Sequence, residues 1–156
     1  MKHLIAFICK VRVLGIILLT SSSLNATSYT WNGYNGNWSD PSKWIPNGVP
    51  GLTDDVTIPG GTTCTLDGDV IFQSLSISGG TLNGDFDITL TASLTCSGGT
   101  IAGIGDLIVN GATSLTTTYT SLFSRAVYIN GGGSTTAAGR FYTHANCTLH
   151  LPAGQT

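Results

Sequence analysis

The sequence contains no glutamate, and only 9% of its 156 residues are charged. All eight acidic residues are aspartate, which favours turns, whereas glutamate favours helices. Cations are equally scarce: beyond residue 26 the only strong ones are Lys43, Arg125 and Arg140. Residues 27–156 therefore carry a net charge of −5, from three cations and eight aspartates. Nucleic acids and anionic membranes are bound by basic patches, so we expect neither as a partner.

Disulfide and metal-ligand patterns are also missing. Beyond residue 26 the cysteines are Cys64, Cys96 and Cys147, and an odd number leaves at least one outside an intrachain disulfide. No Cys-x-x-Cys spacing is present, so we predict no metal site and no cofactor. His144 and His150 have no nucleophile motif nearby, and we interpret them as surface residues.

No apolar run is long enough to span a bilayer, which needs about 20 residues. The longest, Val13 to Leu19, follows a basic start with Lys10 and Arg12 and precedes the small-residue site Leu24-Asn25-Ala26. This arrangement predicts a secretory signal peptide over residues 1–26, the alternative being an uncleaved anchor. We expect a secreted or cell-surface protein whose mature chain does not insert into the membrane.

What the chain has in abundance is glycine at a fixed interval. Three triplets lie 19 residues apart: Gly60-Gly61-Thr62, Gly79-Gly80-Thr81 and Gly98-Gly99-Thr100. Residues 56–74, 75–93 and 94–112 can be aligned without a gap, and the aligned positions mostly match in kind. Four columns of this alignment are Val56/Leu75/Leu94, Ile58/Ile77/Cys96, Ile71/Leu90/Val109 and Cys64/Asn83/Ala102. A short fixed period is typical of a solenoid, in which each repeat is one coil.

Strict alternation within each repeat indicates short strands. Leu75 and Ile77 alternate with serines, the pattern of a strand with one buried face. We therefore predict an all-β fold, a right-handed parallel β-helix with about 19 residues per coil and about five coils. The alternative is an antiparallel β-sandwich or jelly roll, which also consists of short strands and turns. The ungapped columns favour the solenoid, because a sandwich does not require them.

The repeat also suggests a domain division. Residues 27–55 differ from it and form a tryptophan-rich N-terminal cap segment, while residues 56–156 form the solenoid. The repeat decays after residue 115 and returns in residues 127–132, which echo residues 75–80. The sequence ends soon after Leu151 without an obvious cap, so we expect a solenoid truncated at its C-terminal end. Its open edge predicts end-to-end self-association.

The N-terminal segment carries a family resemblance. Residues 31–58 contain the string Trp-x-Gly, Asn-Trp-Ser-x-Pro-x-x-Trp, Val-Pro-Gly and Asp-Asp-Val-x-Ile. This string resembles the N-terminal start of the β-helical passenger domains of bacterial autotransporter-like and filamentous-haemagglutinin-like adhesins. The resemblance implies export, surface display and adhesion, with host-surface or extracellular glycans and proteins as partners. The anchoring C-terminal domain usual in that family is not visible in this sequence.

Trp31, Trp38 and Trp44 lie within fourteen residues of one another and are the candidate ligand-binding residues. They could form an aromatic platform for sugar rings. The alternative, which we favour, is that they cap the first coil and cover its apolar layer.

Two carboxylate pairs, Asp67/Asp69 and Asp85/Asp87, suggest enzyme chemistry or calcium binding. Each pair adjoins a glycine, where aspartate is a common turn former, and no Lys or Arg lies in the regular coils. We therefore predict no catalytic residues. The expected function is a non-catalytic exported scaffold of adhesin type, the alternative being a glycan-active enzyme or carbohydrate-binding module.

Overall fold

The computed structural model describes residues 25–116, 120–123, 125–131, 141–143 and 148–151. The chain is all-β, with 55% strand and 3% helix, and forms a parallel β-solenoid of about four turns with coils of about 19 residues. The predicted fold class is confirmed, with about four turns rather than about five. Nearly all of the predicted signal peptide lies outside the described residues. Within the described residues no helix is long and apolar enough to cross a membrane.

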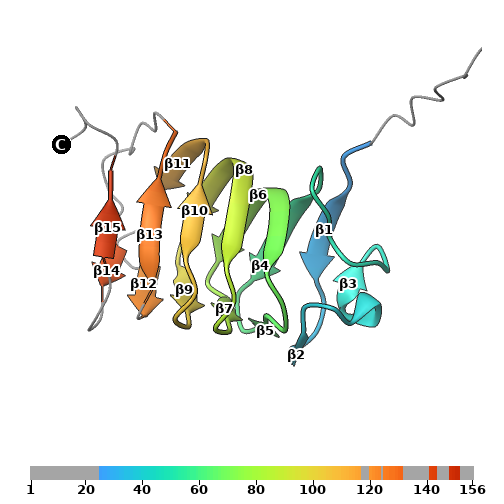
Figure 1. Ribbon diagram of the computed structural model, residues 1–156. Helices are drawn as coiled ribbons and strands as arrows, with labels where there is room; N and C mark the ends of the chain where they lie inside the picture. Colours follow the sequence, from blue (N-terminus) through green and yellow to red (C-terminus); the bar gives the residue numbers. More distant parts are fainter. Residues whose placement is uncertain (1–24, 117–119, 124, 132–140, 144–147, 152–156) are drawn as a thin grey trace, which may run out of the picture.

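Each regular coil has three strand segments, which lie on three faces of the stack (Figure 1). The first face consists of β1 (Ser28–Trp31), β4 (Asp55–Pro59), the second parts of β6 (Val70–Ser78) and β8 (Ile88–Cys96), and β11 (Ala112–Leu115). The second face consists of β2 (Asn35–Asn37), β5 (Thr63–Thr65), β7 (Thr81–Asn83), β9 (Gly99–Ala102), β12 (Thr120–Phe123) and β14 (Phe141–Thr143). The third face consists of the first parts of β6 and β8, with β10 (Leu107–Val109), β13 (Ala126–Ile129) and β15 (Thr148–His150).

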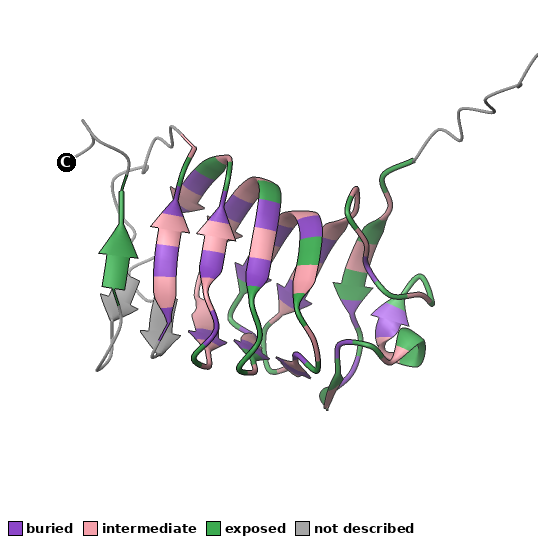
Figure 2. Ribbon diagram, in the orientation of Figure 1, coloured by how far each residue is buried: buried purple, intermediate pink, exposed green. Residues whose placement is uncertain are grey.

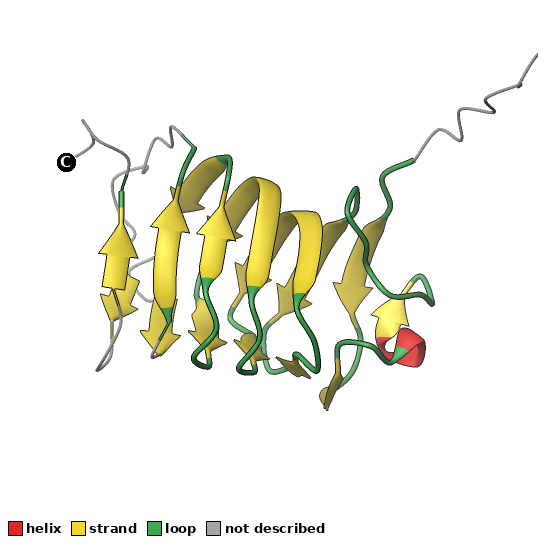
Figure 3. Ribbon diagram, in the orientation of Figure 1, coloured by secondary structure: helices red, strands yellow, loops and turns green. Residues whose placement is uncertain are grey.

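The first and third faces belong to one sheet because β6 and β8 run through the corner between them. One further strand, β3 (Trp44–Ile45), pairs with β1 and is the only antiparallel member among the named strands of the described chain. It follows the short 3-10 helix η1 (Pro41–Lys43), the red element in Figure 3.

The predicted columns of the first face are confirmed. Val56 pairs with Leu75, and Leu75 with Leu94. Ile58, Ile77 and Cys96 form the second column in the same way, two residues along. All six side chains are buried, so like residues stack on like residues from coil to coil. The parallel pairing of successive coils produces these columns, whereas an antiparallel sandwich would not.

The predicted columns through Cys64 and Ile71 were wrong, because the register of the first coil is shifted by one residue relative to the second. The turn between Pro59 and Thr63 has three residues, whereas the turn between Ser78 and Thr81 has two. Thr63 therefore pairs with Thr81, and Cys64 with Leu82 rather than with Asn83. The step on the second face is 18 residues here, and a bulge between Phe72 and Ser74 restores 19.

The same register shift changes which residue of the third face is buried. Phe72, not Ile71, pairs with Leu90 and is fully buried, while Ile71 pairs with Thr89 and is half exposed. The lower part of the column, Leu90 over Val109, is as predicted. The apolar doublet of residues 71 and 72 allowed either register, and only the bulge decides between them.

The predicted echo of residues 75–80 by residues 127–132 was also wrong. Val127 pairs with Leu107, and Ile129 with Val109, so β13 continues the third face and not the first. The step between these coils is 20 residues rather than 19, since Leu107 precedes Val127 by that number. Strand patterns on the two faces are alike, and sequence alone does not tell which face a strand joins.

The core is a single continuous cluster along the axis of the stack. Strands show alternating burial, with inward apolar residues in purple and outward residues in pink or green in Figure 2. Close stacking requires glycine at the corners: Gly79 and Gly99 have φ of 100° and 101°. A Cβ on Gly99 would collide with the carbonyl oxygen of Gly80 in the coil before. Glycine is thus needed both for the turn and for the approach of successive coils.

Candidate binding surfaces

The three tryptophans are core residues of the first coil. Each is at most 3% exposed. Trp44 lies between the other two, with ring centroids 4.9 Å from Trp31 and 4.8 Å from Trp38 in edge-to-face geometry. Its indole N–H donates to the carbonyl oxygen of Trp38 at 2.8 Å. Trp38 also packs on Phe72 of the next coil, at 5.1 Å.

This packing decides what the three rings can do. Their faces are in contact with one another and leave no platform on which a sugar ring could stack. The segment is more than a cap, because β1 and β2 pair in parallel with β4 and β5 and so make a first coil. The covering element is β3, which lies against the outer edge of β1.

A different aromatic residue of the segment is available to a ligand. Tyr34 is 87% exposed and lines a pocket of about 350 Å³ together with Asn32, Thr62 and backbone of the Gly60-Gly61 turn. Trp31 also lines this pocket, and its indole N–H has no hydrogen-bond partner among the described residues. Tyr34 could not be recognised from the sequence, since the exposure of a tyrosine between glycines and asparagines follows no periodic pattern.

The aspartates of the coils hold neighbouring coils together. Asp69 Oδ1 accepts from the backbone N–H of Asp87 at 3.0 Å, and Asp87 Oδ1 from that of Asp106 at 2.8 Å. Asp85 Oδ1 accepts from Ile104 N–H at 3.2 Å. Each carboxylate thus satisfies an amide of the corner one coil further on, a structural use at the turns where we expected it.

Asp67 and Asp40 have local partners. Asp67 accepts from the backbone N–H of Ser39 at 3.1 Å and from its hydroxyl, which ties the first coil to the second. Asp40 caps η1 by accepting from Ser42 N–H at 2.9 Å and Ser42 Oγ at 2.6 Å. The hydroxyl hydrogen bond is the main reason that the pKa of Asp40 is lowered from its ordinary value.

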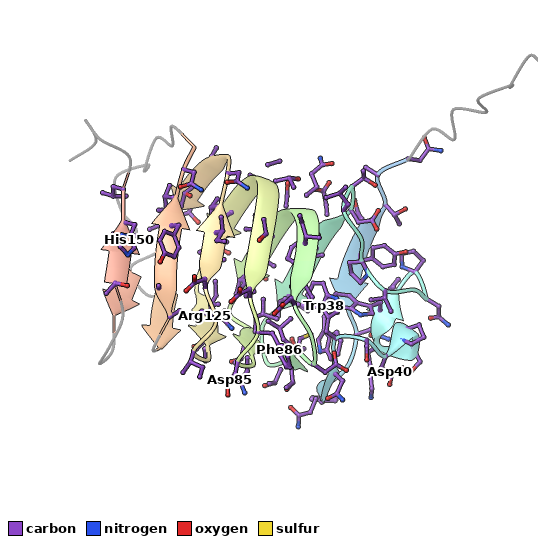
Figure 4. All side chains as sticks on the ribbon, in the orientation of Figure 1. Trp38, Asp40, Asp85, Phe86, Arg125 and His150 are labelled. Carbon is purple, nitrogen blue, oxygen red and sulfur yellow. The ribbon has the colours of Figure 1, made fainter. Side chains whose placement is uncertain are left out.

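No Lys or Arg belongs to the regular coils of residues 56–115, but the side chain of Arg125 reaches back to them from the coil that follows. Arg125 is fully buried and lies inside the corner formed by residues 84–87 and 102–106 (Figure 4). Its guanidinium donates to the carbonyl oxygen of Phe86 at 2.9 Å and to that of Gly105 at 2.8 Å. It also donates to the carbonyls of Gly84 and Ala102. One side chain therefore joins the corners of two preceding coils.

Burial lowers the pKa of Arg125, and the charges of Asp87, Asp85 and Asp106 oppose that shift. A guanidinium has five N–H donors, and carbonyl acceptors on several sides satisfy them without a direct ion pair. Little in the sequence indicates this role, except that Arg125 is the only Lys or Arg between residues 44 and 139. Its use is structural, because each of its hydrogen-bond acceptors is a backbone carbonyl oxygen.

The outer side of the first face bears a regular array of hydroxyls, here called the hydroxyl grid. Three outward columns, headed by Asp55, Thr57 and Pro59, cross four coils. Strand pairing sets the first two, and backbone hydrogen bonds from Ser97 and Thr116 to the coil before extend the third. Nine of these twelve positions are serine or threonine: Thr57, Ser74, Ser76, Ser78, Ser93, Thr95, Ser97, Ser114 and Thr116. None of the nine is buried. Adjacent coils in a sheet are about 4.8 Å apart and alternate residues about 6.6 Å, which sets the spacing of the grid.

The remaining candidates are isolated. Exposed His150 stacks on Tyr128 with ring centroids 4.4 Å apart, and His144 lies outside the described residues. Cys64 and Cys96 are both buried, and burial raises the pKa of the Cys64 thiol. Cys147 also lies outside the described residues. In the described part of the chain, no three His, Cys, Asp or Glu side chains are grouped so as to hold a metal ion.

A second pocket, of about 420 Å³, lies where residues 49–52 face the corner of residues 67–71. It is lined by apolar side chains and two aspartates. No family model matches the chain, and neither a curated protein nor a solved structure was found to match it. The class that the structure defines is therefore the parallel β-solenoid, and function must be argued from its surfaces.

Proposed function

We propose that this protein is a non-catalytic, exported β-solenoid scaffold with an adhesive role at the cell surface or outside the cell. The hydroxyl grid is the observation that carries this proposal. The resemblance of the tryptophan segment to adhesin passengers agrees with it, as does the apolar run near the N-terminus. Extracellular glycans are the partners that we favour.

The grid suits a neutral polar partner. The β-sheet holds the hydroxyls at fixed spacing, so little side-chain entropy is lost on binding. A hydroxyl can donate and accept; those of Ser97 and Thr116 already donate to the carbonyls of Ile77 and Cys96, which leaves them acceptors for a ligand. Asp55, at one corner of the array, is its only charged position. A repetitive glycan carries hydroxyls at regular intervals and could contact several coils at once. Such multivalent contact gives useful avidity from weak individual bonds.

The proposal is tested with the purified full chain on a glycan array and on immobilised extracellular-matrix proteins. The double variant Ser76→Lys, Thr95→Lys places two bulky charges in the centre of the grid. The matched control, Thr89→Lys with Thr91→Lys, adds the same charge to half-buried or exposed positions of β8 outside the grid. We expect at least about tenfold weaker binding for the grid variant and an unchanged control. Equal binding by both variants would contradict an adhesive role of this face.

A carbohydrate-binding module is a second candidate, favoured by exposed Tyr34 beside its pocket. An aromatic ring flanked by amide and hydroxyl groups is typical of a site for a single sugar. Tyr34→Ala would then abolish binding of a short oligosaccharide, whereas the grid variant would not. The control is Tyr34→Phe, which keeps the ring and should retain most of the affinity.

The enzyme alternative depends on Asp85 and Asp87. Both accept hydrogen bonds from the next coil, an arrangement that uses them as structural acceptors. A glycan depolymerisation screen, with and without a chelator, distinguishes the two roles. We expect no product; activity that is lost in Asp85→Ala or Asp87→Ala would instead establish a glycan-active enzyme.

A further inference from the structure

The larger pocket, here called the cap pocket, lies between the N-terminal coil and the second coil. Two segments about twenty residues apart form it: residues 49–52 from the loop after β3, and residues 67–71 before β6. Its volume of about 420 Å³ lies at the lower end of the range for small-molecule or side-chain sites, about 300–1,000 Å³. Trp38 and Ser39 also line it.

Three large apolar side chains in this pocket are left in solvent. Val49, Leu52 and Ile71 are 42%, 53% and 50% exposed. Ile71 is exposed because the bulge after Phe72 places the phenylalanine, and not the isoleucine, in the core. Exposed apolar side chains that converge from separate segments are typical of interaction sites, whereas scattered ones are not.

The pocket is held in shape before any ligand arrives. Asp54 Oδ2 accepts from Gly51 N–H at 2.8 Å, and Asp54 Oδ1 from Thr27 N–H at 2.9 Å. The carbonyl oxygen of Asp54 accepts from Gln73 N–H at 2.9 Å, which ties the loop to the bulge of β6. A loop held by three hydrogen bonds loses little further freedom on binding, which favours affinity.

The second wall of the pocket is acidic. Asp67 and Asp69 line it, and both are exposed. Hydrogen bonds from Ser39 and from Asp87 N–H orient these carboxylates but bring no positive charge. No lysine or arginine lines this pocket in the described part of the chain. Two negative charges beside an apolar wall therefore have no cation to complement them.

We propose that the cap pocket binds a basic side chain, arginine or lysine, from an extended segment of a partner polypeptide. Such a side chain combines an aliphatic stem with a charged head. The stem would pack on Leu52 and Ile71, and the head would bind Asp67 and Asp69. Charge complementarity selects this occupant over a neutral apolar one. This site is separate from the hydroxyl grid, so it provides a protein partner in addition to the proposed adhesion.

The proposal is tested with acetyl-Leu-Arg-Leu-amide, which carries one positive charge, in an NMR titration of the full chain. The matched probe replaces arginine by citrulline, which has the same shape and no charge. We expect amide shift changes at Val49, Leu52 and Ile71, with about fivefold weaker binding of the citrulline peptide. Absence of shift changes at these residues, or equal affinity of both peptides, would overturn the proposal. Equally tight binding of n-butylguanidinium alone would assign the pocket to a small organic cation instead.

Charge-removing variants test whether binding depends on Asp67 and Asp69 themselves or only on the net negative charge of the protein. Asp67→Asn with Asp69→Asn removes both charges and keeps one acceptor oxygen at each position for the backbone N–H of Ser39 and of Asp87. The variant loses the oxygen that accepts from the Ser39 hydroxyl, and it should weaken the arginine peptide about fivefold. Asp40→Asn with Asp85→Asn removes the same charge outside the pocket (Figure 4) and should leave affinity unchanged. Equal weakening by both pairs would mean nonspecific attraction and would overturn the site.

The apolar wall has its own control. Leu52→Ser with Ile71→Ser should weaken binding of the arginine peptide by about tenfold, since the stem loses its contact surface. Ile104→Ser removes an exposed isoleucine from a corner outside the pocket and should have no effect. Unchanged affinity of the Leu52, Ile71 variant would show that the peptide binds elsewhere.

Discussion

The two ends of the described solenoid are built differently. At the N-terminal end, β3 pairs with β1 and three tryptophans fill the first coil, each at most 3% exposed. At the other end, β15 pairs with β13 on one side, and its three residues are all exposed (Figures 1 and 2). Leu149 and Leu151 are about half exposed there. Among the described residues, β3 covers one edge of the stack. The other edge presents the apolar side chains of Leu149 and Leu151, and no described strand pairs with the outer edge of β15.

The difference shows what the tryptophan segment does. Every coil buries its inward side chains between two neighbours, so a terminal coil lacks cover on one side. The N-terminal segment supplies that cover with large rings and with one antiparallel strand. Without such a cover, unpaired N–H and C=O groups of an edge strand can pair with another chain.

We expect the largest effect from Trp44→Ala, which disrupts the covered N-terminal end. This ring contacts both other tryptophans and donates a hydrogen bond to Trp38, so its removal leaves a large cavity. We expect the free energy of unfolding to fall by about 3–5 kcal/mol. Ile45→Ala, at an exposed position of the same strand, should cost less than about 1 kcal/mol. Thermal unfolding followed by circular dichroism measures both; similar losses would contradict the capping role.

The second prediction concerns Arg125, which tests how strongly the coils between the two ends are held together. Arg125→Met keeps much of the side-chain volume but leaves the carbonyls of Gly84, Phe86, Ala102 and Gly105 without their donor. We expect a loss of about 2–4 kcal/mol, because four carbonyls, one buried and the others at part-buried hydrogen bonds, lose their donor. Lys43→Met, a cation of the exposed helix η1, is the control and should change stability by less than about 0.5 kcal/mol. A loss below about 1 kcal/mol for Arg125→Met would mean that water replaces the guanidinium.

The open end predicts self-association through β15. We expect sedimentation equilibrium of the full chain to show concentration-dependent oligomers. Leu149→Lys with Leu151→Lys should weaken association at least tenfold, about 1.4 kcal/mol, by placing charges on the edge. The control Ile104→Lys alters an exposed residue away from the edge and should not change it. A protein that is monomeric at all concentrations would refute this prediction.

The smallest effect concerns the buried thiol of Cys64 and pH. Burial raises its pKa above the ordinary 9.0, so the folded protein keeps the thiol neutral while the unfolded chain ionises. Its stabilising contribution is therefore complete below about pH 9 and is lost as pH rises above it. At about pH 9.5 we expect wild type to lose on the order of 1 kcal/mol more than Cys64→Val, relative to pH 7. Urea unfolding at both pH values measures this; an equal loss in both proteins would contradict it.

Much of the fold could be predicted because the 19-residue repeat can be recognised directly in the sequence. The columns headed by Val56 and Ile58 follow directly from a step of 19. The columns through Ile71 and Cys64 were wrong because one extra turn residue and one bulge offset each other, which leaves the overall period unchanged. Both registers bury an apolar residue, so hydrophobic pattern could not choose.

The candidate sites were less predictable. Alternation indicated that Ser76 points outward, yet only the pairing of strands shows that nine hydroxyls form one grid. Tyr34 and the cap pocket depend on loops whose course no periodicity describes. Arg125 contacts carbonyls about 40 residues earlier in the chain, a separation that no local pattern encodes.

An all-β solenoid of about 19 residues per coil follows from the amino-acid sequence alone, because side-chain alternation and corner glycines are local requirements that repeat. Contacts between coils fix which of Ile71 and Phe72 is buried, where the tryptophans pack and which carbonyls Arg125 binds. The physical reason is that these choices depend on the coil above and the coil below. Their energies arise from contacts between residues distant in the chain, and those contacts exist only once the coils have stacked.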